Sequence, residues 1–248
     1  MAKINIYTPT YHRFNKTKVA VESIIKTVNS SKHDVKYFIC DNNSPQEMKN
    51  WICERSDANQ KIEAFLCEEN WGKAKIVNHV HKGARDCDYI VSIDSDMLNT
   101  HTEYNWIDEM VDVMEKVPQI GVLSSFQEGN NCHLFQGLTR RAEVNLSEKK
   151  HTFRFGAVGC VAGGCIIMRS NDFNQIGMYQ VYDVYNGDDA FLMRKTNDML
   201  RKICAVSETI ALEHIVNYDD EDVYQQWKVA KANGQLPNGE GLKGFYDK

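Results

Sequence analysis

The stretch Asp88-Tyr89-Ile90-Val91-Ser92-Ile93-Asp94-Ser95-Asp96 begins as a strand and ends in two acids. Its first half is nearly all nonpolar, as expected for a strand that a sheet buries on both faces. Three further strands are expected before it, at Ile4–Thr8, Val35–Cys40 and Lys61–Cys67. Polar clusters follow these runs, so the first hundred residues divide into short strands separated by longer segments.

The segments between these strands have the periodicity of helices. Nonpolar residues at positions 21, 24, 25 and 28 have the spacing of one helix face, and further helices are expected to about Ser56 and over Gly72–Arg85. Strands that alternate with helices predict a parallel sheet with helices on both sides. Ligands of such sheets collect at the carboxyl ends of the strands. Because polar clusters follow all four strands, we expect a binding site at that edge.

The second half of the chain has a less regular pattern. The expected elements are a helix over 103–116, a strand at Ile120–Ser124, irregular strands and loops over 131–158, a strand at Val161–Arg169, helices over 188–203 and 219–232, and a tail over 233–248. No internal repeat or long linker divides the chain. The sequence therefore predicts one α/β domain over residues 1–215, followed by a C-terminal helix and tail over 216–248.

Composition excludes several classes of protein. The chain has 248 residues, of which 42% are hydrophobic and 25% charged, so it resembles globular rather than disordered proteins. A net charge of -5 does not suggest a nonspecific nucleic-acid coat or a polybasic membrane anchor. The sequence has no run of 18 nonpolar residues, its first residues are too polar for a signal peptide, and its eight cysteines form no C-x-x-C pair. A cytoplasmic protein with reduced cysteines is expected.

Asp94 and Asp96 are candidate metal ligands. Two carboxylates that follow a buried strand point toward the same edge, where they would repel each other unless they are neutralised. A divalent cation would resolve that conflict, and hard oxygen ligands suit Mg²⁺ or Mn²⁺, which commonly bridge to a diphosphate. The alternative is a solvated turn with two surface acids.

Four stretches of the first half occur in a characteristic order. They are Thr8-Pro9-Thr10-Tyr11-His12-Arg13, Asp41-Asn42-Asn43-Ser44, Glu69-Asn70-Trp71-Gly72-Lys73-Ala74 with Asn78, and Ile93-Asp94-Ser95-Asp96. Together they resemble the motifs TPTYNR, DDxS, N-x-G-x-x-x-A-x-N and D-x-D of the family 2 glycosyltransferases. The resemblance extends from Ile4 to about His214. It implies a GT-A fold with a Rossmann-like, mixed but mostly parallel central sheet flanked by helices.

The resemblance also implies a nucleotide-sugar donor held by residues 1–98 and an acceptor held by residues 99–215. The backbone from Thr8 to Tyr11 and the carboxylate of Asp41 would hold the base, often uracil. Lys73 either approaches the diphosphate or is a solvated lysine in the first turn of a helix. The donor-side residues implied in this way are Thr8, Pro9, Tyr11, Arg13, Asp41, Asn70, Lys73, Asp94 and Ser95.

On the other side of the site, residues 161–169 resemble the glycine-bearing strand that lines the acceptor in this family. Gly163 and Gly164 would let the backbone approach a sugar ring, with a simple bulge as the alternative. By the same resemblance Asp96 would ligate the metal, and Asp94 would lie near the metal or the ribose. His214 would complete the metal shell unless it is a structural histidine.

Residues 187–192, Gly-Asp-Asp-Ala-Phe-Leu, are similar to the family motif G-E-D-x-x-L. Asp189 would be the catalytic base, whereas Asp188 replaces the usual glutamate with a shorter side chain, which leaves its role open. The implied reaction is a metal-dependent, inverting sugar transfer in which Asp189 accepts the proton of an acceptor hydroxyl. Acids at a helix N-terminus are also ordinary dipole compensation.

Two other classes of function compete with sugar transfer. A sugar-nucleotide nucleotidyltransferase would carry an early glycine-rich phosphate loop, and residues 8–13 contain no glycine. A noncatalytic module that only binds nucleotide sugars would have no need of the acids and the histidine together.

The acceptor expected by default is a glycan or a surface-polysaccharide precursor. One segment, however, is locally basic, with a net charge of +3 from Arg140, Arg141, Lys149, Lys150 and Arg154 against Glu143 and Glu148. A solvated loop explains it, but so would a phosphate-rich acceptor, including DNA with a hydroxymethylated base. The acidic total charge makes DNA the minority interpretation.

Overall fold

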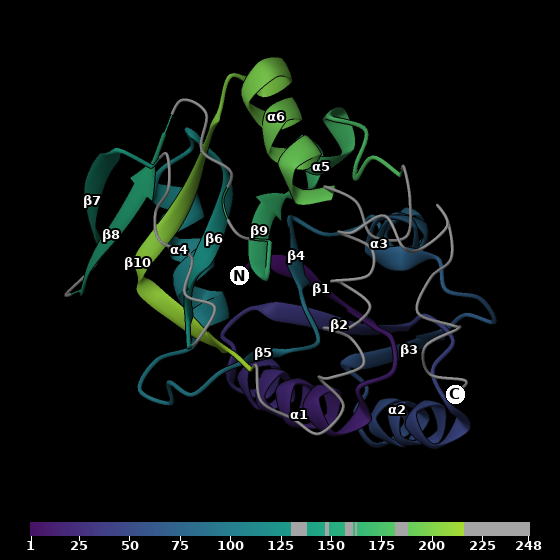
Figure 1. Ribbon diagram of the computed structural model, residues 1–248. Coiled ribbons are helices and arrows are strands. Elements are labelled where there is room, and N and C mark those ends of the chain that lie inside the picture. The colour runs from purple at the N-terminus through teal and green to yellow at the C-terminus, as the bar shows by residue number, and fades with distance from the viewer. Residues whose placement is uncertain (130–137, 147–148, 157–160, 162, 182–187, 216–248) are drawn as a thin grey trace.

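The computed structural model describes residues 1–129, 138–146, 149–156, 161, 163–181 and 188–215. It contains strands and helices in alternation through the first half, as the sequence predicts (Figure 1). The strands are β1 (Lys3–Thr10), β2 (Asp34–Asp41), β3 (Ile62–Leu66), β4 (Tyr89–Ile93), β5 (Met97–Leu98), β6 (Ile120–Glu128), β7 (Arg140–Leu146), β8 (Lys149–Phe155), β9 (Cys165–Arg169) and β10 (Ile203–His214). The helices are α1 (Phe14–Ser30), α2 (Gln46–Ala58), α3 (Gly72–Gly83), α4 (Trp106–Lys116), α5 (Ser170–Gln175) and α6 (Asp188–Leu200).

All these strands belong to one mixed sheet. Its order is β3-β2-β1-β4-β9-β6-β10-β8-β7, and the short β5 pairs with β10. Strands β3, β2, β1 and β4 are parallel neighbours, and β6 and β10 are also parallel to each other. Strand β9 is antiparallel to both β4 and β6, which flank it. The predicted α/β class and mostly parallel sheet are therefore confirmed.

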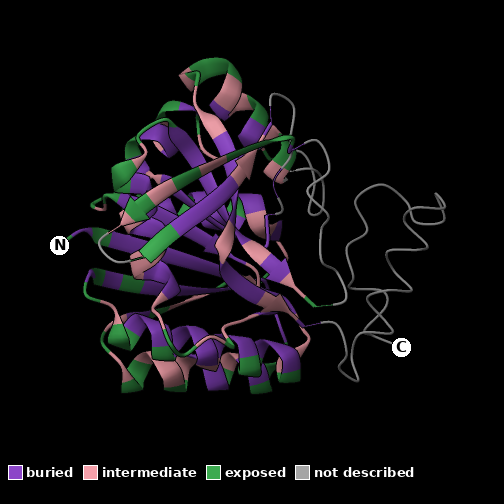
Figure 2. Ribbon diagram, turned by 90° about the vertical axis from the view of Figure 1, so that its left-hand side faces the viewer, coloured by how far each residue is buried: buried purple, intermediate pink, exposed green. Residues whose placement is uncertain are grey.

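Helices cover both faces of the sheet and bury two hydrophobic cores. Nonpolar residues of α1, α2 and α4 pack with Ile4, Ile6 and their neighbours on one face. Residues of α3, α5 and α6 pack with Tyr7 and its neighbours on the other face. The alternation along β1 explains the division, because successive side chains of a strand point to opposite faces. Figure 2 shows buried residues along the sheet and exposed residues on the outer sides of the helices.

Two expectations for the second half are wrong. Irregular strands and loops were expected over 131–158, but the two strands described there, β7 and β8, pair with each other in regular antiparallel register. The helix expected over 188–203 ends at Leu200, because Arg201 adopts a left-handed conformation (φ 56°) and β10 begins at Ile203. The expected helix over 219–232 and tail over 233–248 lie outside the described residues. No helix in the described ranges is long and nonpolar enough to span a membrane.

Candidate active site

The topology brings the candidate site residues to one edge of the sheet. Strands β1, β2, β4, β6 and β10 run in the same direction, so their carboxyl ends meet there. Strand β9 runs the opposite way, and it therefore brings the preceding Gly163 and Gly164 to the same edge. Lys73 and Asp189 lie in the first turns of α3 and α6. Residues from both halves of the chain thus converge.

The residues expected to hold the base lie at the ends of β1 and β2. Asp41 is completely buried, and its Oδ1 accepts a hydrogen bond from Thr10 Oγ1 at 3.0 Å. Its Oδ2 accepts from the backbone N–H of Ser44 at 2.9 Å. Tyr37 donates its hydroxyl to Thr8 Oγ1 at 3.0 Å. Asp41 therefore holds the turn after β2 against β1, and a bound base would have to share its oxygens.

The neighbouring loops complete this end of the site. Pro9 is half-buried, whereas Tyr11 is buried with its ring 4.4 Å from that of His12. Asn70 Oδ1 accepts from the backbone N–H of Gly72 at 2.9 Å at the start of α3. The buried Nδ2 of Asn70 has no hydrogen-bond partner within the described ranges. Asn70 therefore has a buried amide donor that is not satisfied by the described residues.

Arg13 connects the first loop to the D-x-D turn. Its Nη1 lies 2.9 Å from Asp96 Oδ2, and its Nη2 lies 3.5 Å from Ser95 Oγ. His12 and Arg13 both have left-handed backbone conformations, with φ of 53° and 51°. Each such residue costs about 1–2 kcal/mol. This unfavourable turn directs the guanidinium toward Asp96.

Asp96 and His214 offer part of a metal site. His214 Nε2 lies 3.4 Å from Asp96 Oδ2, and the buried Oδ1 of Asp96 has no hydrogen-bond partner in the described part of the chain. Burial opposes the ionisation of Asp96, but Arg13 and His214 outweigh it and hold its pKa well below the usual range. The hydrogen bond to Asp96 raises the pKa of His214, against the opposing effect of burial. A free carboxylate oxygen beside an imidazole fits a divalent cation.

A complete shell is not preformed. Across the described residues, no three His, Cys, Asp or Glu side chains are arranged to hold a metal ion. Asp94 contacts Lys73, and its expected place near the metal or the ribose stays a prediction. A cation at Asp96 and His214 would therefore need further oxygen ligands, such as those of a diphosphate.

Lys73 occupies the centre of the site and is not a solvated lysine. Its side chain is only 16% exposed, and Nζ lies 2.9 Å from Asp94 Oδ1 and 3.3 Å from Asp189 Oδ1. It also donates to the carbonyl of Gly163 at 3.0 Å. Burial lowers the pKa of Lys73, but Asp189 and Asp94 outweigh it, so this pKa is well above the ordinary value. The pKa of Asp94 is raised to about 6 by burial and by the charges of Asp96 and Asp189, although the ammonium of Lys73 acts to lower it.

The two glycines before β9 have a packing role that the sequence did not indicate. A Cβ at Gly163 would lie 1.7 Å from Asp189 Oδ2, and one at Gly164 would lie 2.0 Å from the Nε2 of Gln127. The absence of side chains at these positions makes room for a carboxylate and an amide of the protein itself. Gly163 therefore defines the position of Asp189. The side chain of Asp188 lies outside the described residues, although α6 begins at this position.

Gln127 and Tyr179 also lie at the site, beside Gly164 and near Lys73, although no sequence motif includes them. Asn78 exchanges two hydrogen bonds with the backbone of Tyr179, from Nδ2 to the carbonyl at 2.8 Å and from the N–H to Oδ1 at 3.0 Å. Burial raises the pKa of Tyr179. Its buried hydroxyl has no hydrogen-bond partner among the residues that the structure describes. No motif or spacing identifies either residue, because each reaches the site only through sheet order or the pairing with Asn78.

The basic segment on β7 and β8 is largely neutralised by acids from other elements. Arg141 and Arg154 both contact Glu208, the Arg141 contact being 2.7 Å. Lys149 contacts Glu109 at 2.5 Å, and Lys150 contacts Glu143 at 3.2 Å. Glu109 and Glu208 come from α4 and β10, so local sequence could not reveal this pairing. The charge that suggested a phosphate-rich acceptor is thus mostly compensated.

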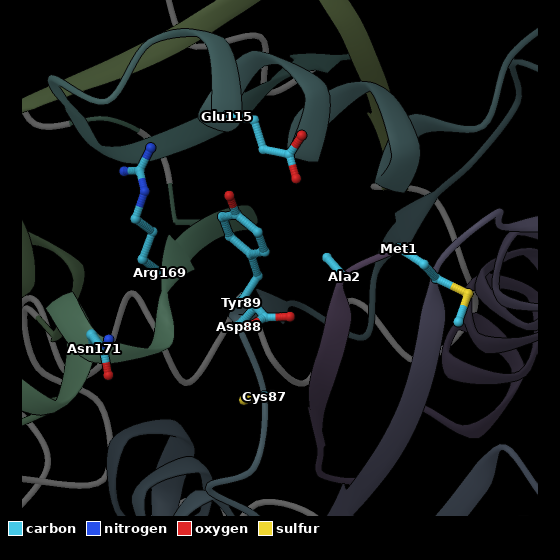
Figure 3. Close-up of a pocket in the computed structure, with 8 residues that line it drawn as sticks. All are labelled: Met1, Ala2, Cys87, Asp88, Tyr89, Glu115, Arg169 and Asn171. Atoms are coloured by element: carbon cyan, nitrogen blue, oxygen red, sulfur yellow. The ribbon is translucent and has the colours of Figure 1, made fainter.

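A separate pocket of about 510 Å³ lies at the opposite edge of the sheet (Figure 3). It is formed where β1 and β4 begin and β9 ends, and α4 contributes Glu115. Its lining residues are Met1, Ala2, Cys87, Asp88, Tyr89, Glu115, Arg169 and Asn171. Arg169 donates to the carbonyls of Ile120 and Met114, so it fixes the end of α4. None of the candidate site residues lines this pocket.

A mostly parallel sheet with a D-x-D turn after its central strand, and an acid opposite that turn, defines a protein of the GT-A class. Residues 5–177 match the family described as Glycosyl transferase family 2. This match covers well over half of the chain, and the chain belongs to that family. The predicted resemblance and fold are confirmed. No curated protein shows significant sequence similarity to the chain.

Solved structures share the fold at low sequence identity. The chain is similar to the mannosyltransferase PcManGT from Pyrobaculum calidifontis in complex with GDP-Man and Mn²⁺, with a TM-score of 0.67, 13% identity, and coverage of 96% of this chain and 66% of that one. It is also similar to GalNAc-T7 with UDP, GalNAc and Mn²⁺, with a TM-score of 0.64, 13% identity, and coverage of 88% of this chain and 44% of that one. For S. aureus TarS the TM-score is 0.62 and the identity is 15%, with coverage of 98% of this chain and 41% of that one. The chain thus spans from about two-fifths to two-thirds of the length of these proteins.

Proposed function

We propose that this protein transfers a sugar from a nucleotide-sugar donor to an acceptor hydroxyl with inversion at the anomeric carbon. The observation that carries the proposal is the contact of one ammonium, that of Lys73, with both Asp94 and Asp189. This contact supports the proposal because an acid from the second half of the chain lies beside the D-x-D turn, where the diphosphate of a nucleotide-sugar donor would be held. Family membership and the titles of the related structures support the donor class.

The reaction would proceed by one displacement. The acceptor oxygen forms a bond to the anomeric carbon as the bond from that carbon to the diphosphate oxygen breaks. Asp189 accepts the acceptor's hydroxyl proton, so no covalent bond between sugar and enzyme is needed. Arg13 and Lys73 provide positive charge on the side where the diphosphate becomes the leaving group.

Asp96 and His214 are the residues that would hold a divalent cation, Mn²⁺ or Mg²⁺. Such an ion, when bound, supplies charge neutralisation for the diphosphate. Asp96 stays ionised because Arg13 and His214 stabilise its charge, so it is ready to act as a ligand. Asp94, Ser95 and Asn70 would contact the donor from the surrounding turns, and the loop from Thr8 to Tyr11 would hold the base.

We infer that UDP is the nucleotide and that the acceptor is a glycan. The compensated charge on β7 and β8 favours a glycan over DNA, because a phosphate-rich acceptor requires unpaired cations. Nucleotidyl transfer and binding without catalysis are the competing functions, and both are separable from sugar transfer by their products.

A thermal-shift screen tests the donor. Nucleoside diphosphates and nucleotide sugars of uridine and guanosine are added with and without Mn²⁺, and binding to the folded protein raises its Tm. Uridine compounds with Mn²⁺ are expected to give the largest shift. Release of sugar from the bound donor would then separate catalysis from binding, and pyrophosphate formed from a sugar phosphate and a nucleoside triphosphate would indicate nucleotidyl transfer. No shift with any of these compounds would contradict the proposal.

Asp189→Asn tests the base. The substitution should not weaken donor binding but should lower turnover by about 10²–10⁴-fold, because the amide cannot accept the proton. Turnover close to that of the unaltered protein would exclude Asp189 as the base.

A further inference from the structure

Lys73 is an unusual residue for its place in α3. It is the second residue of the helix, where the positive end of the helix dipole disfavours a cation. The helix has no acidic residue in its first turn and no side-chain cap. The local helix therefore gains nothing from Lys73, and the reason for a lysine must lie in its tertiary contacts.

These contacts join the two halves of the site. Lys73 Nζ lies 2.9 Å from Asp94 in the donor half, and 3.0 Å from the Gly163 carbonyl in the acceptor half. It lies 3.3 Å from Oδ1 of Asp189, the base in the proposed reaction. One ammonium therefore contacts an acid from each half, through hydrogen bonds to Asp94 and the Gly163 carbonyl and an ion pair with Asp189.

The contact with Asp189 is weaker than the contact with Asp94. Asp189 Oδ1 is buried and makes no hydrogen bond to the described residues, so the ion pair with Lys73 holds this oxygen. Gly163 packs against Oδ2 on the other side. In this arrangement the oxygen that faces Lys73 is held by the same ammonium that contacts Asp94, the first acid of the D-x-D motif.

We propose that Lys73 is a positioning residue that holds Asp189 beside the D-x-D turn and releases it when the donor diphosphate attracts the ammonium. This inference rests on the proposed sugar transfer. A diphosphate carries more negative charge than a carboxylate, and lysine binds phosphate as a point charge. Donor binding then precedes activation of the acceptor, because Asp189 is freed only when the diphosphate is present.

The proposal makes Asp189 and the diphosphate competitors for one ammonium. Loss of the Asp189 charge should therefore tighten diphosphate binding, but only while Lys73 is present. If Asp189 and the diphosphate simply repel each other, removal of the Asp189 charge would also tighten binding. In that case, however, the effect would be the same with or without Lys73. A double-mutant cycle in nucleotide affinity separates the two explanations.

The experiment measures the Kd of UDP and of GDP by calorimetry with Mn²⁺ for the unaltered protein, Lys73→Met, Asp189→Asn and the double variant. Lys73→Met is expected to weaken binding by about 10-fold, the effect of losing one charged hydrogen bond. Asp189→Asn is expected to tighten binding by about 5-fold in the unaltered background. In the Lys73→Met background its effect should fall below about 2-fold.

Lys82→Met is the matched control, since Lys82 is an exposed lysine of the same helix. It should leave the Kd unchanged. If Lys73→Met does not fold, Lys73→Gln replaces it, because an amide retains hydrogen bonds to Asp94 and the Gly163 carbonyl without the charge.

An equal effect of Asp189→Asn in both backgrounds, or no effect in either, would overturn the positioning role while nucleotide binding and the proposed function stand. If neither nucleotide binds the unaltered protein, the proposed function fails and the release step fails with it. The two failures are therefore distinguishable.

Discussion

Gly163→Ala should displace the proposed base without changing any charge. The added Cβ would lie 1.7 Å from Asp189 Oδ2, and 2.0 Å from its Cγ. Because real Cβ contacts stay above 3.0 Å, the carboxylate must retreat by about 1.3 Å. The same movement shifts the carboxylate relative to Lys73, whose Nζ lies 3.3 Å from its Oδ1 in the structure.

A misplacement of about 1 Å at a reacting group costs about 10²-fold in rate. We therefore expect Gly163→Ala to lower sugar release from a nucleotide sugar in Mn²⁺ by about 10²-fold. Its nucleotide affinity should stay within about 5-fold of the unaltered protein, since Asp96 and His214 are not displaced. The assay follows sugar release, and calorimetry gives the affinity.

Gly83→Ala is the matched control, because a Cβ there meets nothing within 4 Å. It should keep full turnover and can add up to about 1 kcal/mol of stability through helix propensity. Should Gly163→Ala release sugar as fast as Gly83→Ala, the position of Asp189 has no part in the reaction. A folded Gly163→Ala protein that no longer binds nucleotide would show that the glycine acts on the donor instead.

Three further substitutions test separate parts of the molecule. Asp96→Asn should weaken Mn²⁺-dependent nucleotide binding by about 10-fold or more, as measured by calorimetry. Asp86→Asn is the control, because Asp86 is fully exposed, and it should leave the affinity unchanged. If the two variants bind nucleotide with equal affinity, Asp96 is excluded as a metal ligand. Asp41→Ala should lower the free energy of unfolding in urea by about 1–3 kcal/mol, because Thr10 and the turn lose a buried acceptor; an unchanged midpoint would contradict this. Burial lowers the pKa of His101, but the hydrogen bond and charge of Glu128 outweigh it and raise this pKa. The ion pair of His101 with Glu128 therefore stabilises the fold at low pH, and this stabilisation is lost as the pH rises through the raised pKa. His101→Gln should therefore lower Tm at pH 6 and have little effect at pH 9, and an effect that grows with pH would refute the sign.

The first half of the fold was predictable because its signals are local. The nonpolar strands and the helix face at positions 21–28 depend on spacing along the chain, and the structure confirms them. The hairpin of β7 and β8 was missed because both strands lie at the sheet edge and present mostly exposed polar residues. Such strands have too few buried residues to show a clear alternation.

The candidate site was predictable only in part. Motif resemblance identified Asp94, Asp96 and Asp189 by residue type and order, and these assignments remain predictions of role. The motif resemblance left open whether Lys73 is a solvated lysine. The structure shows that Lys73 is largely buried between two acids. The approach of Gly163 to a sugar ring stays a prediction, and the structure adds that this glycine makes space for the Asp189 carboxylate.

Local spacing was enough to predict the alternating strands and helices of the first half and the acids at the end of β4, and the order of the motifs was enough to identify the family. Which charges neutralise one another became visible only in the folded chain. Lys73 meets Asp189 across 116 positions of the chain, and Arg13 meets Asp96 across 83. The physical reason is that ion pairing depends on distance and burial in space, and β9, inserted antiparallel between β4 and β6, sets both at this edge.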